Sequence, residues 1–466
     1  MPSLLPLISI LPVLASAAAL TPPSQLFSPL ISQKILATAS NTSQTLYPQY
    51  TDTLLGQWQY FVPDTWTSGF LPSLMYAMNT RATLCPNGTD GAAAVGGGTW
   101  VELGRSWSAA EVPLETVNTV GHDVGFLSFP FVDELALNPQ NQTAIAAVNA
   151  FANDLAARYN PSVGCTRSWD TADPTLFTVI MDNMMNLDIL LQSEALTGNT
   201  TLRDIATSHA DHTLLNHVRP DGSSFHVVYY NATTGAVISK GTAQGYSNSS
   251  TWSRGHTWGM YGFTNMYSKT NQTRYLDTAR AMATYFVNNV PSSGVVPWDF
   301  NAPTDPYRPS DSSAAMIAAT TFLFLSQQEA SLSPPNKTGE QFWVNAALKV
   351  LNDNIAVAWR PEWQSLLANG TVNNVQSPPN NLTGIVYGDY YFVHSGNALI
   401  SMGLSTCNGS AGPSATANGS TTGSGSGSGG SGGSSGGGKS TGMRGVAVSG
   451  WVAALMAMVA VVGAMV

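Results

Sequence analysis

An aspartate inside a strongly apolar stretch is the first residue whose surroundings could support chemistry. Asp182 lies within residues 176–191, where Leu, Ile, Val, Phe and Met predominate. A carboxyl group in such surroundings loses hydration, so its protonated form is favoured, as a general acid requires. The alternative is a structural aspartate inside a helix, paired with an amide such as Asn183 or Asn186. The segment by itself leaves both roles open.

A second acidic residue follows a histidine in a glycine-flanked turn. Asp123 and His122 lie in the sequence Thr-Val-Gly-His-Asp-Val-Gly-Phe, residues 119–126. Two carboxyl groups, one held protonated and one held ionised, are the usual equipment for cleaving glycosidic bonds. The alternative is that Asp123 is the N-cap of a helix that contains Phe126 and Phe129, and an isolated aspartate at such a position favours this role.

A third group of polar and aromatic residues lies between residues 226 and 258. It comprises His226, Gln244, Arg254 and Trp258. The guanidinium of Arg254 can bind a carboxylate or sulfate, and Trp258, one helical turn later, can present an aromatic face to a sugar ring. The alternative is packing, in which Arg254 pairs with a structural carboxylate and Trp258 belongs to the core.

Composition argues against some classes of function. The 466 residues carry a net charge of −9 and only 10% are charged, so we expect no basic surface and no nucleic-acid binding. No His, Cys or carboxylate cluster has the spacing of metal ligands, so we expect no metal and no other cofactor. The three cysteines, Cys85, Cys165 and Cys407, allow at most one intrachain disulfide, and the sequence does not select the pair.

The elements that must position these residues are helices. From residue 24 to residue 407, apolar residues at helical spacing are frequent and strand-like alternation is rare. An Asn-x-Thr turn precedes an Ala-rich amphipathic segment at Asn141, Asn199, Asn271 and Asn336. These segments predict outer helices, and residues 176–191 predict an inner helix that is apolar on most sides. Six such hairpins would close into an all-α (α/α)6 barrel, with an open α-solenoid as the alternative.

Both ends of the chain predict export. Residues 1–19 combine an apolar run with small residues, as in a signal peptide, and many Asn-x-Ser/Thr acceptors predict a glycoprotein. Residues 410–441 are almost wholly small and polar and predict a flexible stalk. The apolar residues 446–466 predict a signal for attachment of a GPI lipid anchor, with a retained membrane helix as the alternative. We therefore expect a secreted protein that is anchored at the cell surface, on the plasma membrane or cell wall.

Seven segments occur in the order found in a known enzyme family. They are Trp-Thr-Ser-Gly-Phe at 66–70, Gly-His-Asp-Val-Gly-Phe at 121–126, Met-Asp-Asn-Met-Met-Asn-Leu at 181–187, Phe-His-Val-Val at 225–228, Trp-Ser-Arg-Gly-His-Thr-Trp at 252–258, Pro-Trp-Asp-Phe at 297–300 and Gly-Asp-Tyr-Tyr-Phe at 388–392. Together they closely resemble glycoside hydrolase family 88, the unsaturated glucuronyl hydrolases. The resemblance implies a six-hairpin barrel that removes a 4,5-unsaturated uronic acid from the non-reducing end of oligosaccharides made by polysaccharide lyases.

The resemblance also implies roles for the residues singled out above. Asp182 would donate a proton to C4 of the double bond and activate the water that adds at C5, with Asp123 as the second essential acid. The residues that would line the sugar subsites are Trp66, His122, His226, Gln244, Arg254 and Trp258. Two departures from the family leave substrate choice open: His256 replaces a common Gln, and a Gly/Ala-rich insertion at residues 87–98 is expected near the mouth of the barrel.

Two other functions are compatible with the same residues. An unsaturated rhamnogalacturonyl hydrolase would use the related barrel on pectin fragments. A catalytically silent cell-surface protein would keep the barrel for glycan recognition. The presence of both Asp182 and Asp123 favours an enzyme whose partners are an unsaturated uronyl oligosaccharide and, through the lipid anchor, a membrane.

Overall fold

The computed structural model describes residues 20–41, 43–305 and 307–414. The predicted signal peptide, most of the predicted stalk and the predicted anchor signal lie outside these residues. Within the described ranges, every helix is too short or too polar to cross a lipid bilayer.

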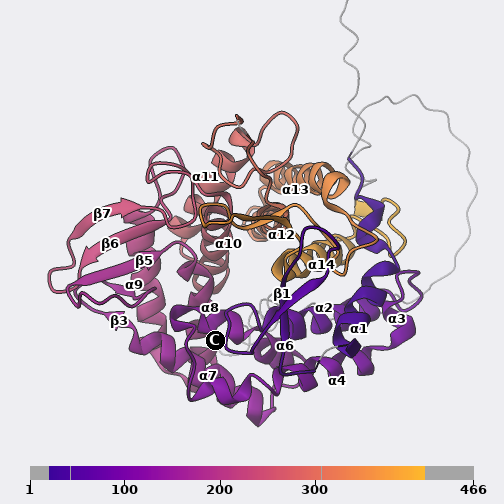
Figure 1. Cartoon of the computed structure of the whole chain (residues 1–466), viewed down its shortest axis with the longest axis horizontal. Coiled ribbons are helices and arrows are strands. Elements are labelled where there is room, and N and C mark those ends of the chain that lie inside the picture. Colours follow the sequence, from indigo (N-terminus) through magenta and orange to yellow (C-terminus); the bar gives the residue numbers. More distant parts are fainter. Residues whose placement is uncertain (1–19, 42, 306, 415–466) are drawn as a thin grey trace, which may run out of the picture.

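The helices form two layers around a closed ring (Figure 1). The inner helices, buried on most sides, are α2 (Phe70–Leu84), α6 (Phe129–Leu137), α8 (Asn183–Thr197), α10 (Ser253–Thr270), α12 (Ser312–Ser331) and α14 (Val386–Ser401). The outer helices are α1 (Leu30–Asn41), α4 (Gly97–Ser108), α7 (Gln142–Ala157), α9 (Thr200–Asn216), α11 (Thr273–Asn289) and α13 (Lys337–Ala358). Because α14 packs against α2, the ring is closed. The predicted (α/α)6 barrel is confirmed, and the open α-solenoid is wrong.

As the sequence predicted, an Asn-x-Thr turn lies at the start of each of α7, α9, α11 and α13, and in three of these helices the asparagine side chain also caps the helix. Asn141, Asn199 and Asn336 accept hydrogen bonds from backbone N–H groups in the first turns of α7, α9 and α13. Such bonds satisfy donors that have no partner inside the helix. Asn271 differs, because it adopts a left-handed conformation (φ 53°) at the end of α10, and α11 begins at Thr273. Asn271 therefore ends one helix instead of starting the next.

The predicted continuous helix over residues 176–191 is wrong in its first part. Leu176–Ile180 forms strand β5, and α8 begins only at Asn183. Three of the five strand residues are Thr, Val or Ile, whose branched side chains favour an extended backbone. Asp182 therefore lies in the turn between a strand and a helix, not inside a helix.

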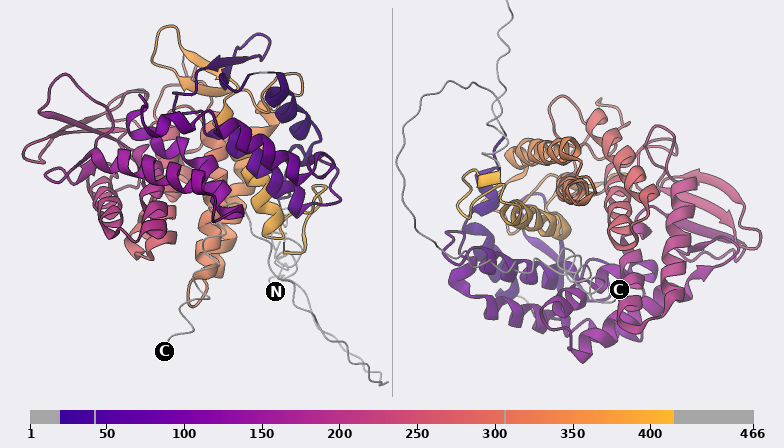
Figure 2. Two further views of the ribbon diagram at one scale, coloured as in Figure 1. Left: turned by 90° about the horizontal axis from the view of Figure 1, so that it is seen from below. Right: turned by 180° about the vertical axis from the view of Figure 1, so that it is seen from behind.

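Short antiparallel strands form four small sheets in the described segments between the helices. They are β1 (Tyr47–Thr51) with β2 (Trp58–Phe61), β3 (Tyr159–Asn160) with β4 (Cys165–Thr166), β5 with β6 (Val227–Asn231) and β7 (Val237–Gly241), and β8 (Gly370–Asn373) with β9 (Asn380–Thr383). The hairpins β1–β2 and β8–β9 stand together at one end of the ring (Figure 2), which we call the hairpin end. Short helices complete the chain: η1 (Ser24–Phe27), α3 (Ala92–Val95), η2 (Val112–Glu115), η3 (Gly121–Asp123) and α5 (Val124–Leu127).

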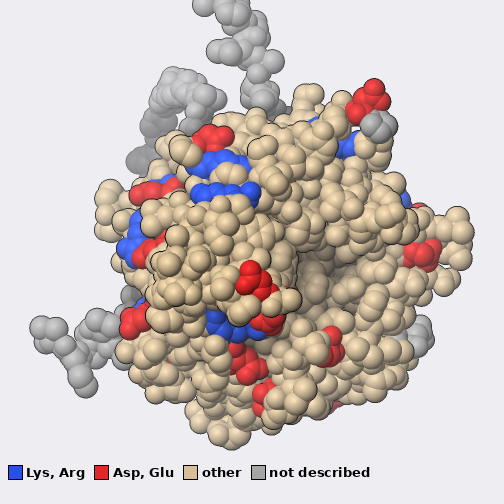
Figure 3. All heavy atoms as spheres, turned by 60° about the vertical axis from the view of Figure 1, so that its left-hand side comes forward, with Lys and Arg blue, Asp and Glu red and all other residues tan. Residues whose placement is uncertain are grey.

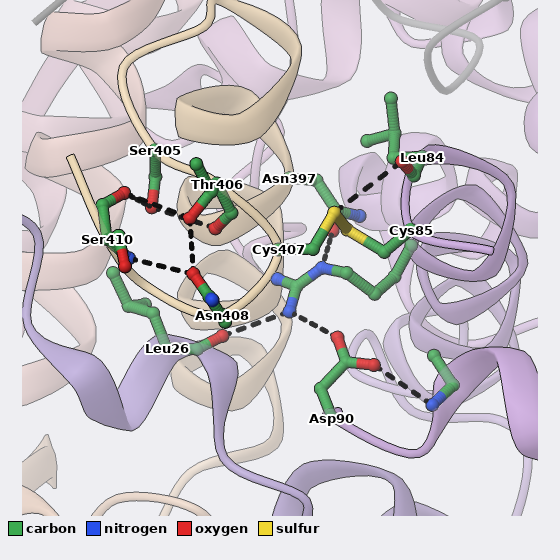
Figure 4. Close-up of a disulfide and its surroundings, with 12 residues drawn as sticks. Leu26, Leu84, Cys85, Asp90, Asn397, Ser405, Thr406, Cys407, Asn408 and Ser410 are labelled. Atoms are coloured by element: carbon green, nitrogen blue, oxygen red, sulfur yellow. Dashed lines mark hydrogen bonds and ion pairs between the residues drawn. A yellow bond between two sulfur atoms is a disulfide. The ribbon is translucent and has the colours of Figure 1, made fainter. Parts of the chain in front are cut away.

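A disulfide joins Cys85 and Cys407 (Figure 4). Cys85 is the C-cap of α2, so the disulfide marks the end of the ring opposite to the N-termini of the inner helices, which we call the disulfide end. Cys165 is free and buried. The prediction of at most one disulfide is therefore confirmed within the described residues.

The insertion at residues 87–98 lies at the disulfide end, and the expectation that it lies near the mouth is wrong. Its Asp90 forms an ion pair of 3.0 Å with Arg81, and both side chains are fully buried. Arg81 is in the last turn of α2, whereas Phe70 begins that helix at the hairpin end. The rise of an α-helix separates the two ends by about 16 Å, so this insertion does not contact the hairpin end.

Replacement of Asp90 by Ala is expected to destabilise the fold strongly. Arg81 would keep its hydrogen bonds to Asn397 and to the carbonyl of Leu26, but it would lose its carboxylate partner, and breaking a buried pair costs about 3–5 kcal/mol. Chemical denaturation measures the loss. The control, Glu340→Ala, breaks a surface pair with Lys337 and is expected to cost less than about 1 kcal/mol. Similar losses for the two variants would contradict the prediction.

Candidate active site

The inner helices begin at the hairpin end, so their N-termini meet there. Asp182 precedes α8, Arg254 lies in the first turn of α10, Asp311 precedes α12 and Tyr387 lies in the first turn of α14. Helix N-termini carry partial positive charge on backbone N–H groups without a partner in the helix. Their convergence therefore favours an anionic ligand.

Asp182 occupies the N-cap position of α8, but its side chain faces a histidine instead of capping the helix. Its Oδ2 lies 3.5 Å from Nε2 of the buried His226, and the Asp182 side chain is 13% exposed. The carboxyl group is thus mostly shielded from water but remains accessible to a ligand. The structural alternative of a pair with a neighbouring amide is wrong, because Asn183 donates to β4 and Asn186 donates to Asp123.

Asp123 also occupies an N-cap position, that of α5, and its carboxyl group likewise faces a histidine. Its Oδ1 lies 3.2 Å from Nε2 of His122 and 3.4 Å from Nδ2 of Asn186, and the side chain is 19% exposed. Burial raises the pKa of Asp123 and the charge of Asp182 raises it further, whereas His122 and Asn186 lower it. Because Asn186 lies one turn after Asp182 in α8, its hydrogen bond ties Asp123 to the start of the helix that Asp182 precedes.

Two tryptophans flank His226. The ring of Trp252 lies 4.4 Å from the imidazole, and that of Trp169 meets it edge-on at 6.1 Å. Sequence reasoning did not propose either tryptophan as a site residue. Trp252 begins one of the family segments, which was a usable signal, whereas Trp169 lies in a loop after β4 that offers no periodicity.

Arg254 is only 2% exposed and is engaged within the protein. Its Nη1 donates to Asp311 at 2.9 Å and to the carbonyl of Thr371, and its Nη2 donates to the carbonyl of Val372 at 2.8 Å. Gln244 donates to that same Val372 carbonyl at 3.1 Å. The expectation of a guanidinium open to a ligand is corrected: the alternative, a pair with a structural carboxylate, describes Arg254, which ties α10 to α12 and β8.

Trp66 and Trp258 contact the same two aromatic rings. Trp66 is partly exposed and lies 5.3 Å from Phe126 and 5.0 Å from Tyr387. Trp258 lies 5.5 Å from Phe126 and 6.1 Å from Tyr387, and it is 1% exposed. Trp66 can therefore meet a sugar, whereas the burial of Trp258 favours the packing alternative. Tyr387, which sequence reasoning missed, joins the two tryptophans and lies beside Arg254.

His256 lies outside the site, between α10 and α11. Its Nε2 donates to the carbonyl of Met282 at 2.9 Å, and its Nδ1 lies 2.9 Å from Oγ of Ser224. Burial lowers the pKa of His256 to about 4. The expectation that this position affects substrate choice is corrected, because its side chain packs helices together.

The eight candidate residues thus gather around the hairpin end, although they differ in exposure. Among the described residues, no group of three or more His, Cys, Asp or Glu side chains is arranged to hold a metal ion. On the face shown in Figure 3, Lys and Arg occur in small groups beside Asp and Glu, and the surface of the hollow is largely uncharged.

Comparison with known proteins places the chain among enzymes of one kind. No protein-family model matches it. It is 34% identical over 334 residues to an unsaturated glucuronyl hydrolase of Formosa agariphila, with 71% of this chain and 78% of that protein covered. It is 31% identical over 280 residues to the unsaturated glucuronyl hydrolase of Bacillus sp. strain GL1, with 59% and 73% covered.

Solved structures agree with these relatives. The crystal structure of the Bacillus sp. GL1 enzyme, described as responsible for the degradation of glycosaminoglycan, matches with a TM-score of 0.69 and 27% identity, covering 80% of this chain and 96% of that one. The similarity in sequence and the six-hairpin barrel confirm the resemblance carried by the seven segments. The chain therefore belongs to the unsaturated glucuronyl hydrolases, family 88 of the glycoside hydrolases.

Proposed function

We propose that this chain removes 4,5-unsaturated glucuronyl residues from the non-reducing end of oligosaccharides produced by polysaccharide lyases. The observation that carries the proposal is that Asp182 and Asp123 each lie beside a buried histidine at the end of the barrel where the helix N-termini meet. The relatives support the substrate class. Besides the two enzymes described above, a relative from Streptococcus agalactiae, 28% identical over 279 residues, is an unsaturated chondroitin disaccharide hydrolase.

The proposed chemistry is hydration of the C4=C5 double bond. C5 of the unsaturated sugar carries the ring oxygen, so protonation at C4 leaves a cation at C5 that this oxygen stabilises. The carboxyl group of Asp182 donates that proton, and its carboxylate then takes a proton from the water whose oxygen bonds to C5. One water is consumed and Asp182 returns to its starting state. The hemiketal so formed opens and expels the shorter sugar.

The substrate carries a carboxylate, and the hairpin end suits an anion. The helix N-termini that converge there favour negative charge. Trp66 and Trp169 are partly exposed and offer aromatic surface to a sugar ring, and Gln244 is also partly exposed. The buried Trp258 packs against Phe126 and Tyr387, the two rings that Trp66 also contacts.

Asp182→Asn is expected to lower kcat by about 10²–10⁴-fold, because an amide can neither give the proton nor take it back. The measurement is the loss of ultraviolet absorbance of the double bond in an unsaturated glucuronyl disaccharide. The matched control is Asp188→Asn on the same helix, where the carboxylate binds Gln192 and Asn265 away from the site. It should keep most of the activity. A kcat within tenfold of the parent for Asp182→Asn would contradict the assigned role.

The same assay separates the proposed function from its alternatives. Faster turnover of an unsaturated rhamnogalacturonyl disaccharide than of the glucuronyl one would assign the chain to pectin fragments. Oligosaccharide binding without turnover of either would identify a silent glycan-binding protein.

We also propose that the chain is a secreted glycoprotein held at the cell surface by a GPI anchor. The sequence supports this through residues 1–19, the small-residue stalk and the apolar residues 446–466. Acceptor asparagines such as Asn87, Asn199 and Asn408 are exposed.

Phosphatidylinositol-specific phospholipase C is expected to release the protein from intact cells, because it cleaves the lipid that holds a GPI-anchored chain. Immunoblotting of the medium and the cell fraction measures the release. Protein that stays on the cells and dissolves only in detergent would favour the retained membrane helix.

A further inference from the structure

A buried carboxylate in the last turn of α6 holds the asparagine that begins α7. Glu134 accepts from Nε and Nη2 of Arg105 at 2.9 and 2.8 Å and from the hydroxyl of Tyr76 at 2.9 Å. It also accepts from Nδ2 of Asn141 at 2.8 Å. Oδ1 of Asn141 meanwhile accepts from two backbone N–H groups in the first turn of α7. Both ends of this carboxamide therefore face the protein.

The same arrangement recurs across the ring, between α12 and α13 (Figure 1). The buried Glu329 accepts from Nε and Nη2 of Arg280 at 2.7 and 2.6 Å and from Nε1 of Trp343 at 3.3 Å. Nδ2 of Asn336 donates to it at 2.8 Å, and Oδ1 of Asn336 accepts from the N–H of Gly339 at the start of α13. Two separate networks thus use an asparagine amide as a donor to a buried carboxylate.

The turns before α9 and α11 lack this arrangement. Asn271 is exposed, and its carboxamide makes no hydrogen bond with any residue that the structure describes. Asn199 is also exposed, and its Oδ1 accepts from the N–H of Thr201. The nearby carboxylate of Glu194 binds Arg203 through two hydrogen bonds and makes none with Asn199.

The acceptor sequence for N-linked glycans is the same on both sides of this contrast. Asn-Gln-Thr occurs at residues 141–143 and again at 271–273, and both copies precede an outer helix. The two asparagines therefore differ in what holds their amides, not in the motif that a glycosylating enzyme reads.

We propose that the folded protein carries N-linked glycans on Asn271 and Asn199, whereas Asn141 and Asn336 stay unmodified because buried carboxylates hold their amide nitrogens. The proposal rests on the secretion proposed above, since only a secreted chain meets the glycosylating enzyme.

The chemistry of attachment takes place at Nδ2. This nitrogen attacks C1 of an oligosaccharide carried on a lipid diphosphate: the N–C1 bond forms, the bond from C1 to the phosphate oxygen breaks, and one Nδ2 hydrogen leaves as a proton. A sugar on Asn141 would have to fit where the amide meets Glu134, and the carboxylate would lose a donor, which is unfavourable for a buried acceptor. Chains modified there would fold poorly and be removed by chaperones and proteases.

The proposed glycans lie far from the candidate active site. Asn199 and Asn271 follow α8 and α10, two inner helices that begin at the hairpin end. The 18 residues of α10 place Asn271 about 27 Å from that end. Glycans on these turns therefore surround the disulfide end and leave the hairpin end open to oligosaccharides.

The first test maps the glycans in the full chain, expressed in a fungal host and recovered folded from the cells and the medium. Peptide N-glycosidase in ¹⁸O-water converts each glycosylated asparagine into labelled aspartate, which mass spectrometry of peptides counts. Conversion at Asn271 and Asn199 should exceed that at Asn141 and Asn336 by about tenfold or more, the ratio that loss of a hydrogen bond to a charged group produces.

The result separates this inference from the proposal on which it rests. Equal conversion of Asn141 and Asn271 would overturn the inference and leave the secreted glycoprotein standing. Conversion at no asparagine of the chain would overturn both.

The second test removes the carboxylate. In Glu134→Ala, conversion at Asn141 should rise to the level found at Asn271. The matched control is Glu194→Ala, which removes the carboxylate that binds Arg203 and should leave conversion at Asn199 unchanged. Glu329→Ala repeats the test at Asn336 if Glu134→Ala does not fold. An unmodified Asn141 in a folded Glu134→Ala, or an unmodified Asn336 in a folded Glu329→Ala, would show that the carboxylate is not the cause.

Discussion

Closure of the ring, where α14 packs against α2, is the constraint on which the rest of the molecule depends. In a closed ring of helical hairpins, consecutive inner helices all run in the same direction, because each is followed by an outer helix that returns to the starting end. Their N-termini must then meet at one end. Residues as distant in sequence as Trp66, Asp182 and Tyr387 therefore contribute to a single site.

Closure of the ring does not by itself connect the loops at the hairpin end to one another. Arg254 makes hydrogen bonds that connect them. Its guanidinium connects the N-terminus of α12, through Asp311, with two carbonyls of β8. Gln244 reaches one of those carbonyls from the loop after β7. A guanidinium expected to bind substrate thus holds the protein loops of the site together.

The sequence predicted those features that depend on local pattern. The helical layers follow from apolar spacing, and the starts of the outer helices α7, α9, α11 and α13 follow from Asn-x-Thr turns directly before Ala-rich segments. The seven segments located the two carboxyl groups, which single-residue reasoning had left undecided.

Features that depend on distant partners could not be predicted in the same way. Residues 176–180 form a strand because they pair with β6, which lies some fifty residues later in the sequence. The Arg254 guanidinium binds within the protein because Asp311, at the start of another helix, forms an ion pair with it. The raised pKa of Asp123 depends on burial by elements that no local pattern connects to it.

The disulfide at the far end of the barrel has a topological consequence. It joins the first inner helix to the segment after the last one, across 322 positions of sequence, and so makes the ring of helices a covalent loop. A protease that cuts a single exposed turn between Cys85 and Cys407 would open the chain without separating it into two pieces. The nicked molecule would keep both fragments tethered beside each other, so one cleavage need not mean the loss of either half.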